Sequence, residues 1–390
     1  MKVLMISWEY PPHVVGGLGR HVFHLSENLT SKGIDVKVLT FTDGSSKAEE
    51  RVHEVDVIRV NPYGLRYPDF VSWVHGLNML MMEHAASMND FDIIHVHDWL
   101  TAPSSIMMKH LRRRPLIATI HSTETGRRGG LRNDHERHIH ELEWMLSYEA
   151  WHMICCSNYM RREVSNNLGC PWDKITLIPN GCDPNGLGLP AKLDRRKFAN
   201  DREKIILYVG RLVYEKGPQL MIEAASKLSR WDLKYLIVGD GPMKPYLVDM
   251  TRRLGMADKI CFLGHIPDGE LSALYRLAVA AVFPSLYEPF GIVALEAMGA
   301  GAPVIVSGVG GLDEIVQHGQ NGLKFIPGSS DSLAYNLNWM MTDGALRERC
   351  IRNARQTLGG FSWGAVADDT INVYKRVLGE YEGGAWKPTF

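Results

Sequence analysis

The sequence has few cysteines, no excess of charge of either sign and no long apolar run. Its six cysteines form no C-x-x-C pair and follow no regular spacing, so a disulfide framework and a structural zinc site are both poor interpretations. Lys plus Arg number 43 against 44 Asp plus Glu, and this balance does not favour nucleic acid as a partner. No segment reaches the ~18 apolar residues of a membrane-spanning helix. We therefore expect a cytoplasmic protein without a transmembrane segment.

The chain of 390 residues is long enough for two or three domains. Short apolar runs alternate with longer amphipathic stretches, which is the pattern of parallel strands joined by crossover helices, so we expect an α/β fold. Expected strands are 2–7, 35–40, 92–97, 115–120, 152–156 and 175–178 in the first half, and 204–210, 233–239, 259–263, 280–283 and 303–307 in the second. Expected helices include 19–31, 218–229 and 291–300.

A stretch rich in glycine and proline, residues 180–190, interrupts this rhythm and predicts a linker. We expect one domain over 1–182 and a second over 183–361. The remaining segment, 362–390, contains an amphipathic helix that we expect to cross back to the first domain, with a loose tail from Gly383. Two open parallel sheets leave a cleft lined by the loops at the carboxyl ends of their strands, where we expect the ligand.

Glycines cluster directly after the first expected strand. Gly16, Gly17 and Gly19 open the following helix, where free amides and a partial positive charge suit an anion such as a diphosphate. The cluster does not match G-x-G-x-x-G, so a nicotinamide or flavin site is unsupported. The alternative interpretation is a turn that packs the helix against the sheet.

Two basic residues follow the first strand of the second half. Arg211 and Lys216 lie on the loop after 204–210, where a guanidinium and an ammonium can neutralise phosphate oxygens. An ordinary solvated position is the alternative for each of them taken alone. Their place at the expected cleft favours a clamp for a charged leaving group.

A pair of glutamates frames the start of another helix. Glu288 ends a strand-loop junction and Glu296 lies in the helix that follows, so the two carboxylates can address different parts of one ligand. One can bind a sugar and the other a ribose. The amides of 291–293 at this helix start again favour phosphate.

Histidines are concentrated in the first half of the chain. His97-Asp98-Trp99 and His121 follow two expected strands, and His121 is the best candidate for the acceptor side of the site. Packing is the alternative for any single histidine. His135, His138 and His140 do not share one helix face and lack a carboxylate that would complete a ligand set, so we expect no metal site there.

Together these motifs resemble the retaining glycosyltransferases of the GT-B fold, glycosyltransferase family 4, with similarity to the glycogen and starch synthases of family 5. The most specific element is the E-x7-E motif of Glu288 and Glu296. Supporting motifs in chain order are Gly16-Gly17-Leu18-Gly19, His97-Asp98-Trp99, Ile120-His121, Pro179-Asn180-Gly181, Gly210-Arg211, Lys216-Gly217, Val238-Gly239-Asp240-Gly241-Pro242 and Val309-Gly310-Gly311. The resemblance covers nearly the whole chain and implies two Rossmann-like α/β/α domains.

The resemblance also implies a nucleotide diphosphate sugar as donor, with no metal and no other cofactor. It implies that Arg211 and Lys216 bind the diphosphate, Glu296 the ribose and Glu288 the donor sugar, with His121 beside that sugar. Amides that complete the phosphate cradle would be those of Gly17, Gly19, Phe290, Gly291, Ile292 and Val293. Asp98 and Asn180 are weaker candidates for the acceptor or sugar site.

The resemblance favours transfer of a hexosyl group, best a glucosyl group from ADP- or UDP-glucose, to an α-glucan with retained configuration. One departure leaves the acceptor open, because Val14-Val15 stand where synthases have lysine-x before Gly16-Gly17-Leu18. The alternatives are a small soluble glycoside, a sugar phosphate or a lipid-linked product, a nucleotide-sugar epimerase, and a non-catalytic binding module.

The partners follow from the same argument. We expect a nucleotide-sugar donor, a carbohydrate or small hydroxyl acceptor, and no nucleic acid. The short basic runs Arg112-Arg113-Arg114 and Arg127-Arg128 are interpreted as solvated faces, although peripheral membrane contact stays open. The sequence leaves the oligomeric state undetermined.

Overall fold

The computed structural model describes residues 1–64, 66–183, 187, 190–228 and 232–384. It divides the chain into two compact units, one formed by Met1–Asn180 with the C-terminal stretch from Trp363, and the other by Gly181–Ser362. The sequence-based boundaries, at 182/183 and 361/362, lie within two residues of these divisions. Part of the expected linker, and residues 385–390 of the expected loose tail, lie outside the described residues.

The first unit is built on a sheet with the strand order β3-β4-β2-β1-β5-β6-β7-β8 in its described residues. The pairings are parallel except that of β3 with β4. The strands are β1 (Lys2–Ile6), β2 (Asp35–Phe41), β3 (Glu49–Val52), β4 (Val55–Val60), β5 (Ile93–His97), β6 (Leu116–Ile120), β7 (His152–Cys155) and β8 (Ile175–Leu177). All residues of β5 and β6 are buried, as expected for parallel strands covered on both faces.

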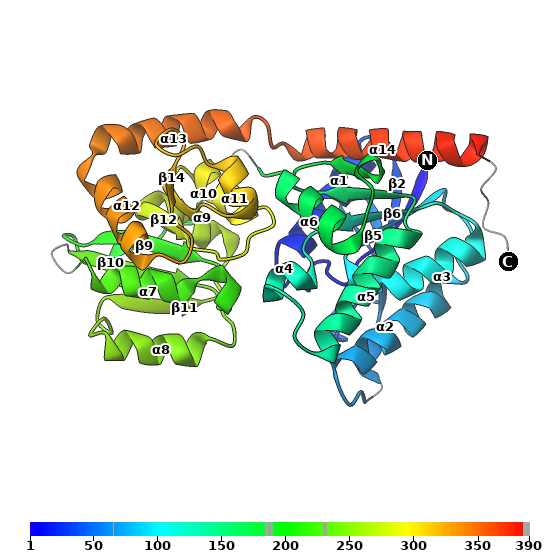
Figure 1. The fold of residues 1–390 in the computed structure, drawn as a ribbon, viewed down its shortest axis with the longest axis horizontal. Coiled ribbons are helices and arrows are strands. Elements are labelled where there is room, and N and C mark those ends of the chain that lie inside the picture. Colours follow the sequence, from blue (N-terminus) through cyan, green and yellow to red (C-terminus); the bar gives the residue numbers. More distant parts are fainter. Residues whose placement is uncertain (65, 184–186, 188–189, 229–231, 385–390) are drawn as a thin grey trace. The chain divides into compact units, whose positions relative to one another are not determined.

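Helices of the first unit connect these strands. They are α1 (Gly17–Ser31), α2 (Phe70–Ala85), α3 (Ala102–Arg112), α4 (Glu124–Arg128), α5 (Asp134–Glu149), α6 (Asn158–Leu168) and, from the far end of the chain, α14 (Trp363–Gly383). Figure 1 shows α14 in red along the unit that contains β1, and it packs against α1. Short 3-10 segments cover Pro62–Gly64, Trp99–Thr101 and Trp172–Lys174.

The second unit holds a parallel sheet with the strand order β11-β10-β9-β12-β13-β14 in its described residues. The strands are β9 (Lys204–Val209), β10 (Leu233–Val238), β11 (Ile260–Gly264), β12 (Ala278–Phe283), β13 (Val304–Ser307) and β14 (Leu323–Phe325). The helices are α7 (Pro218–Ser226), α8 (Lys244–Arg253), α9 (Asp268–Leu277), α10 (Ile292–Ala300), α11 (Gly310–Ile315), α12 (Ser330–Thr342) and α13 (Gly344–Leu358), with 3-10 segments at Arg195–Lys197 and Tyr214–Lys216.

Each strand expected from the sequence is present, and each of the three expected helices is found with its bounds shifted by a few residues. Three further strands, β3, β4 and β14, were not expected. In β3 no residue is buried, so this edge strand lacks the apolar run that reveals buried strands. The three residues of β14 are too few to show any periodicity.

The strand orders place a topological switch in each unit. In the first unit the chain runs outward from β1 to β2 on one side and from β5 to β6 on the other, and in the second the same reversal lies between β9 and β12. Ligands of open parallel sheets bind outside the carboxyl ends of the strands at such a point. The loops after β1, β5, β6, β9 and β12 are therefore the places to look for a site.

No helix in the described part of the chain is long and apolar enough to cross a membrane.

Tyr374 ties α14 to the sheet of the first unit. Its fully buried hydroxyl lies 2.6 Å from Nδ1 of the buried His95, so we predict that Tyr374→Phe lowers the free energy of unfolding by about 1–3 kcal/mol, because a buried polar atom is left unpaired. Urea denaturation followed by fluorescence measures the loss. Tyr335→Phe, at a side chain 68% exposed on α12, serves as the control, and equal losses in the two variants would contradict the prediction.

Candidate active site

Asp98 begins the loop after β5 and holds the loop after β6. Its backbone has φ 59° and ψ 178°, a region that non-glycine residues rarely adopt and that is maintained only where surrounding contacts enforce it. Its carboxylate Oδ1 accepts a hydrogen bond of 2.7 Å from the amide of His121. Asp98 is buried, so this predicted sugar-site residue supports the His121 loop through its hydrogen bond to the His121 amide.

Burial dominates the electrostatics of Asp98. It raises the pKa of the carboxyl to about 6, although the amides of His121 and Ser122 and the charge of Arg127 act in the opposite direction. Asp98 therefore loses its proton within the pH range in which enzymes usually work. Its hydrogen bond with the His121 amide then has a charged acceptor, which makes the bond stronger.

The basic pair at 127–128 corrects one expectation from the sequence. The Arg127 guanidinium is mostly buried and lies 2.8 Å from Glu124 and 3.5 Å from Glu143, so it is not part of a solvated face. Only Arg128 has the expected exposure, with 57% of its side chain accessible. Burial raises the pKa of Glu143 to about 8, against the opposing charge of Arg127.

His121 lies at the carboxyl end of β6 with its ring against other histidines. Its Nε2 is 3.1 Å from Nδ1 of His97, and burial lowers the pKa of His121 to about 3. The imidazole is therefore neutral at physiological pH. A neutral ring can donate or accept a hydrogen bond from a sugar hydroxyl but adds no positive charge to the site.

Asn180, the second weak sugar-site candidate, contacts α1 of its own unit. Its Oδ1 lies 2.8 Å from Nδ1 of His21, and both residues are buried. Since the amide oxygen is an acceptor, His21 Nδ1 carries the proton. The rings of His21 and His121 are 4.7 Å apart between centroids, which brings Asn180 into one connected group with the His121 loop.

The glycine cluster before α1 is organised by Glu9, which the sequence analysis overlooked. The buried Glu9 carboxylate accepts hydrogen bonds from the amides of Val15, Gly16 and Gly19 at 2.9, 3.0 and 3.2 Å. The Gly19 amide, predicted to contact phosphate, is thus engaged by a carboxylate in the ligand-free chain. Burial raises the pKa of Glu9 despite these three amides.

Gly17 is the first residue of α1. The amides of a first helical turn have no partner within the helix, and the contact of the Gly17 amide with a phosphate stays a prediction.

In the second unit, Lys216 and Glu288 form an ion pair. Lys216 Nζ lies 2.8 Å from Oε2 of Glu288, and the Ser285 hydroxyl donates to the same oxygen at 3.0 Å. The Glu288 side chain is 10% exposed and that of Lys216 21%. The two predicted residues, 72 positions apart in the chain, therefore form one half-buried charged site at the β9/β12 switch.

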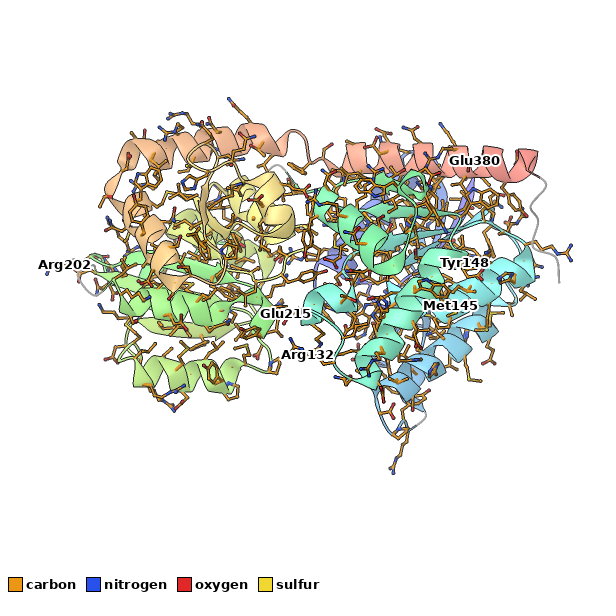
Figure 2. All side chains as sticks on the ribbon, viewed as in Figure 1. Arg132, Met145, Tyr148, Arg202, Glu215 and Glu380 are labelled. Carbon is orange, nitrogen blue, oxygen red and sulfur yellow. The ribbon has the colours of Figure 1, made fainter. Side chains whose placement is uncertain are left out.

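Arg211 lies on the same loop as Lys216 and is more exposed. Its guanidinium is 3.6 Å from Glu215 and 45% accessible, so it is available to a ligand. The Tyr208 hydroxyl donates to the Arg211 carbonyl at 2.9 Å. The Glu215 carbonyl accepts hydrogen bonds from the amides of Leu286 and Tyr287, which ties the Arg211 loop to the Glu288 loop. Glu215 is labelled in Figure 2.

Two glycines allow close backbone approaches to the Glu288 loop. Gly217 has φ +64°, and a Cβ there would lie 1.9 Å from the carbonyl oxygen of Pro284. A side chain at Gly217 would therefore push the Lys216 loop away from the loop that carries Glu288. A Cβ on Gly311, in α11, would lie 2.3 Å from Cα of Phe290 and would push α11 away from the Glu288 loop.

The E-x7-E helix, α10, begins as the sequence predicts. Gly291 is its N-cap with φ 109°, Phe290 is buried, and Ile292 and Val293 of the first turn are partly exposed. Glu296 is 6% exposed in the second turn of the helix. The amides at the start of α10 and the Glu296 carboxylate thus lie on one short element, at the carboxyl end of β12.

The predicted residues fall into two groups, one in each unit. The first unit brings together His121, Asp98 and Asn180, and the second brings together Lys216 and Glu288. Residues that sequence reasoning did not single out support both groups: Glu9, His21, Glu143, Glu215 and Ser285. The sequence could have indicated Glu9, because this carboxylate lies between β1 and the glycine cluster. It could not have indicated His21, because a position within a helix does not show which strand end the side chain faces.

Asp98 also makes stability depend on pH. An unfolded aspartate ionises near pH 4 and folded Asp98 at about 6, so the stability gained from its protonation is complete below about pH 4 and is lost as pH rises through 6. We predict that Asp98→Asn, which keeps the Oδ1 acceptor, gains about 1 kcal/mol relative to wild type between pH 5 and pH 8. Urea denaturation at both pH values measures this difference. The exposed Asp134→Asn should show no such change, and a pH-independent difference for Asp98→Asn would contradict the assignment.

Two family profiles match the chain, one over most of each unit. The profile of the family described as Glycosyltransferase Family 4 matches residues 15–185, and that of Glycosyl transferases group 1 matches residues 191–357. The uncharacterized glycosyltransferase MJ1607 of Methanocaldococcus jannaschii is 40% identical, over 96% of this chain and 98% of its own. Glycogen synthase of Mycobacterium tuberculosis is 37% identical over 96% and 94%.

Among solved structures, the sucrose-phosphate synthase of Thermosynechococcus elongatus matches with a TM-score of 0.85 and 24% identity, over 97% of this chain and 99% of that one. This likeness supports the fold, two Rossmann-like domains of the GT-B type. The sequence-based identification of the family is confirmed: the chain belongs to the GT-B glycosyltransferases of family 4.

Proposed function

We propose that this glycosyltransferase moves a glucosyl group from ADP- or UDP-glucose to a hydroxyl of an α-glucan, with retention of configuration. The observation that carries the proposal is the Lys216–Glu288 ion pair, joined through Glu215 to the loop of the exposed Arg211. The 37% identity with a glycogen synthase over nearly the whole chain supports the choice of donor sugar and acceptor.

The chemistry explains why such a group is needed. Breaking the bond between the anomeric carbon and the phosphate builds negative charge on the departing diphosphate and positive charge on the sugar ring. Arg211 and Lys216 supply fixed positive charge for the first of these. Glu288 lies beside Lys216 and can accept hydrogen bonds from sugar hydroxyls. In this proposal Lys216 therefore contacts the diphosphate and Glu288 the sugar, on the two sides of the bond that breaks.

Lys216 also has a structural role. A buried carboxylate such as Glu288 needs a cationic partner, and Lys216 provides it, together with a hydrogen bond from the Ser285 hydroxyl. A bound diphosphate would share the ammonium with Glu288. The amides at the start of α10 and Glu296, close by along the chain, would hold the phosphate and the ribose.

The first unit would hold the acceptor. The neutral His121 imidazole, with its backbone fixed by Asp98, can orient a hydroxyl without repelling the positive charge that develops on the sugar. In this proposal the acceptor attacks from the face that the diphosphate leaves, and a phosphate oxygen takes the acceptor's proton. Positive charge comes from Arg211 and Lys216, so the proposal requires no metal ion.

We predict that Lys216→Ala lowers the transfer rate about a hundredfold, since one preorganised donor to a developing anion contributes on the order of 3 kcal/mol. Initial rates of nucleotide release with saturating acceptor measure the loss. Lys227→Ala is the matched control, because Lys227 also pairs with a carboxylate, that of Asp331, at a surface of the same unit. A folded Lys216→Ala enzyme with the rate of the control would remove Lys216 from the site.

An incubation of four donors with several acceptors tests the proposed substrates. ADP-glucose, UDP-glucose, GDP-mannose and UDP-N-acetylglucosamine are each combined with glycogen, maltose and small alcohols, and nucleotide release and the anomeric configuration of the product are measured. We expect glycogen-dependent release from ADP- or UDP-glucose and an α-linked product. Release only with small acceptors would overturn the glucan assignment, and an inverted linkage would overturn retention.

A further inference from the structure

Three histidines from separate elements meet at the carboxyl edge of the first unit's sheet. His21 comes from α1, His97 is the last residue of β5, and His121 follows β6. Each offers a ring nitrogen, and these three nitrogens all lie within 4.8 Å of one another. The ring centroids are 4.7–5.4 Å apart.

The hydrogen bonds leave ring nitrogens available to a ligand. In His21, Nδ1 contacts Asn180 Oδ1, and among the residues that the structure describes neither His21 Nε2 nor His97 Nε2 has a hydrogen-bond partner. His21 is 3% exposed and His97 is fully buried. Unpartnered buried nitrogens of this kind are uncommon and call for a ligand or another explanation.

A fourth histidine nearby shows why the group has three members. The ring of His95 lies 4.3 Å from that of His97 between centroids, but both nitrogens of His95 are engaged, Nδ1 by Tyr374 at 2.6 Å and Nε2 by Thr119 at 2.7 Å. It therefore has no lone pair to spare. His21 resembles the ligands of known metal sites, in which one ring nitrogen binds the metal and the other donates to an oxygen that fixes the ring.

We propose that His21, His97 and His121 form a binding site for a divalent cation of the zinc and cobalt class. Imidazole is a preferred ligand of these metals. A tetrahedral ion with metal–nitrogen distances of ~2.0–2.1 Å needs nitrogens about 3.4 Å apart. Nδ1 of His97 and Nε2 of His121, at 3.1 Å, are already close to this spacing. An ion bound to these two atoms would replace the hydrogen bond between them and leave the proton of His97 on Nε2, and small ring rotations within the 4.8 Å group would bring in Nε2 of His21. The fourth position would stay open to water or an oxygen ligand.

The site has a consequence that rests on the proposed function. A cation there would occupy the His121 ring, which we assign to the acceptor. The ion would therefore inhibit transfer rather than assist it, and the inhibition should be reversed by a chelator.

Cobalt(II) titration of the full-length, untagged protein tests the site directly. The protein is first stripped with a chelator and dialysed, and visible absorption then reports Co²⁺ in a low-symmetry nitrogen environment. We expect saturation at one Co²⁺ per chain and displacement by Zn²⁺. No visible band at a twofold excess of Co²⁺ would overturn the proposal.

Two variants and a control locate the ion. His21→Gln should weaken Co²⁺ binding at least a hundredfold, and Asn180→Ala, which keeps all three rings, should weaken it ~10–100-fold through loss of the supporting hydrogen bond. His84→Gln, at an exposed position on α2, should bind as wild type does. Circular dichroism checks that each variant is folded. If Asn180→Ala and His21→Gln both bind like His84→Gln, the ion lies elsewhere and the proposal is wrong.

Transfer assays separate this proposal from the proposed function. Co²⁺ binding needs neither donor nor acceptor, so the site can be confirmed or overturned even if no transfer is found. Inhibition of wild type by Zn²⁺, relieved in His21→Gln, would support both proposals. Binding without inhibition would support the metal site and overturn the assignment of His121 to the acceptor.

Discussion

The proposed chemistry depends on one ion pair, that of Lys216 with Glu288. A departing diphosphate needs positive charge that is already in place, because building it during the reaction would add to the barrier. The pair is half-buried, which strengthens its field relative to an exposed pair, and it is held by the Ser285 hydroxyl on one side and by the Glu215 carbonyl contacts on the other. Gly217 is required where the Lys216 loop meets the backbone of Pro284, on the loop that carries Glu288, and Gly311 where α11 meets Phe290 on that same loop. The local sequence therefore serves to bring one cation and one anion together at the β9/β12 switch.

The first unit is organised by buried polar residues of a different kind. Asp98, Glu143, Glu124 and Arg127 form a buried network in which carboxylates outnumber the arginine, and burial raises the pKa of Asp98 and of Glu143. Such networks are costly unless every member is satisfied. Asp98 fixes the His121 loop through the His121 amide, and burial of the ring keeps the His121 imidazole neutral. A neutral, oriented group suits an acceptor beside a sugar that becomes positive, just as fixed cations suit the leaving group.

Much of this architecture could be predicted from the sequence, for identifiable reasons. Buried parallel strands such as β9 and β12 are mostly apolar in sequence and could be recognised from it. The spaced motif of Glu288, Gly291 and Glu296 marks the loop after one strand and the start of the following helix. The exposed strand β3 and the short strand β14 carry no such pattern. Arg127 was misread because its burial depends on Glu143, which lies on another helix. His21 takes its role from a contact with Asn180, 159 residues further along the chain, and no local spacing in a single sequence encodes such a contact. Glu9 contacts amides only six to ten residues away, so its place just before the glycines was a usable signal.

The binding preference for product nucleotides tests the central claim most directly. Isothermal titration of wild type and of Lys216→Ala with the nucleoside diphosphate and the nucleoside monophosphate of the active donor isolates the contribution of the terminal phosphate. The account predicts that wild type binds the diphosphate at least tenfold more tightly than the monophosphate, and that Lys216→Ala loses most of this preference while its monophosphate affinity is unchanged. An equal preference in the two proteins would contradict the claim that Lys216 neutralises the leaving group.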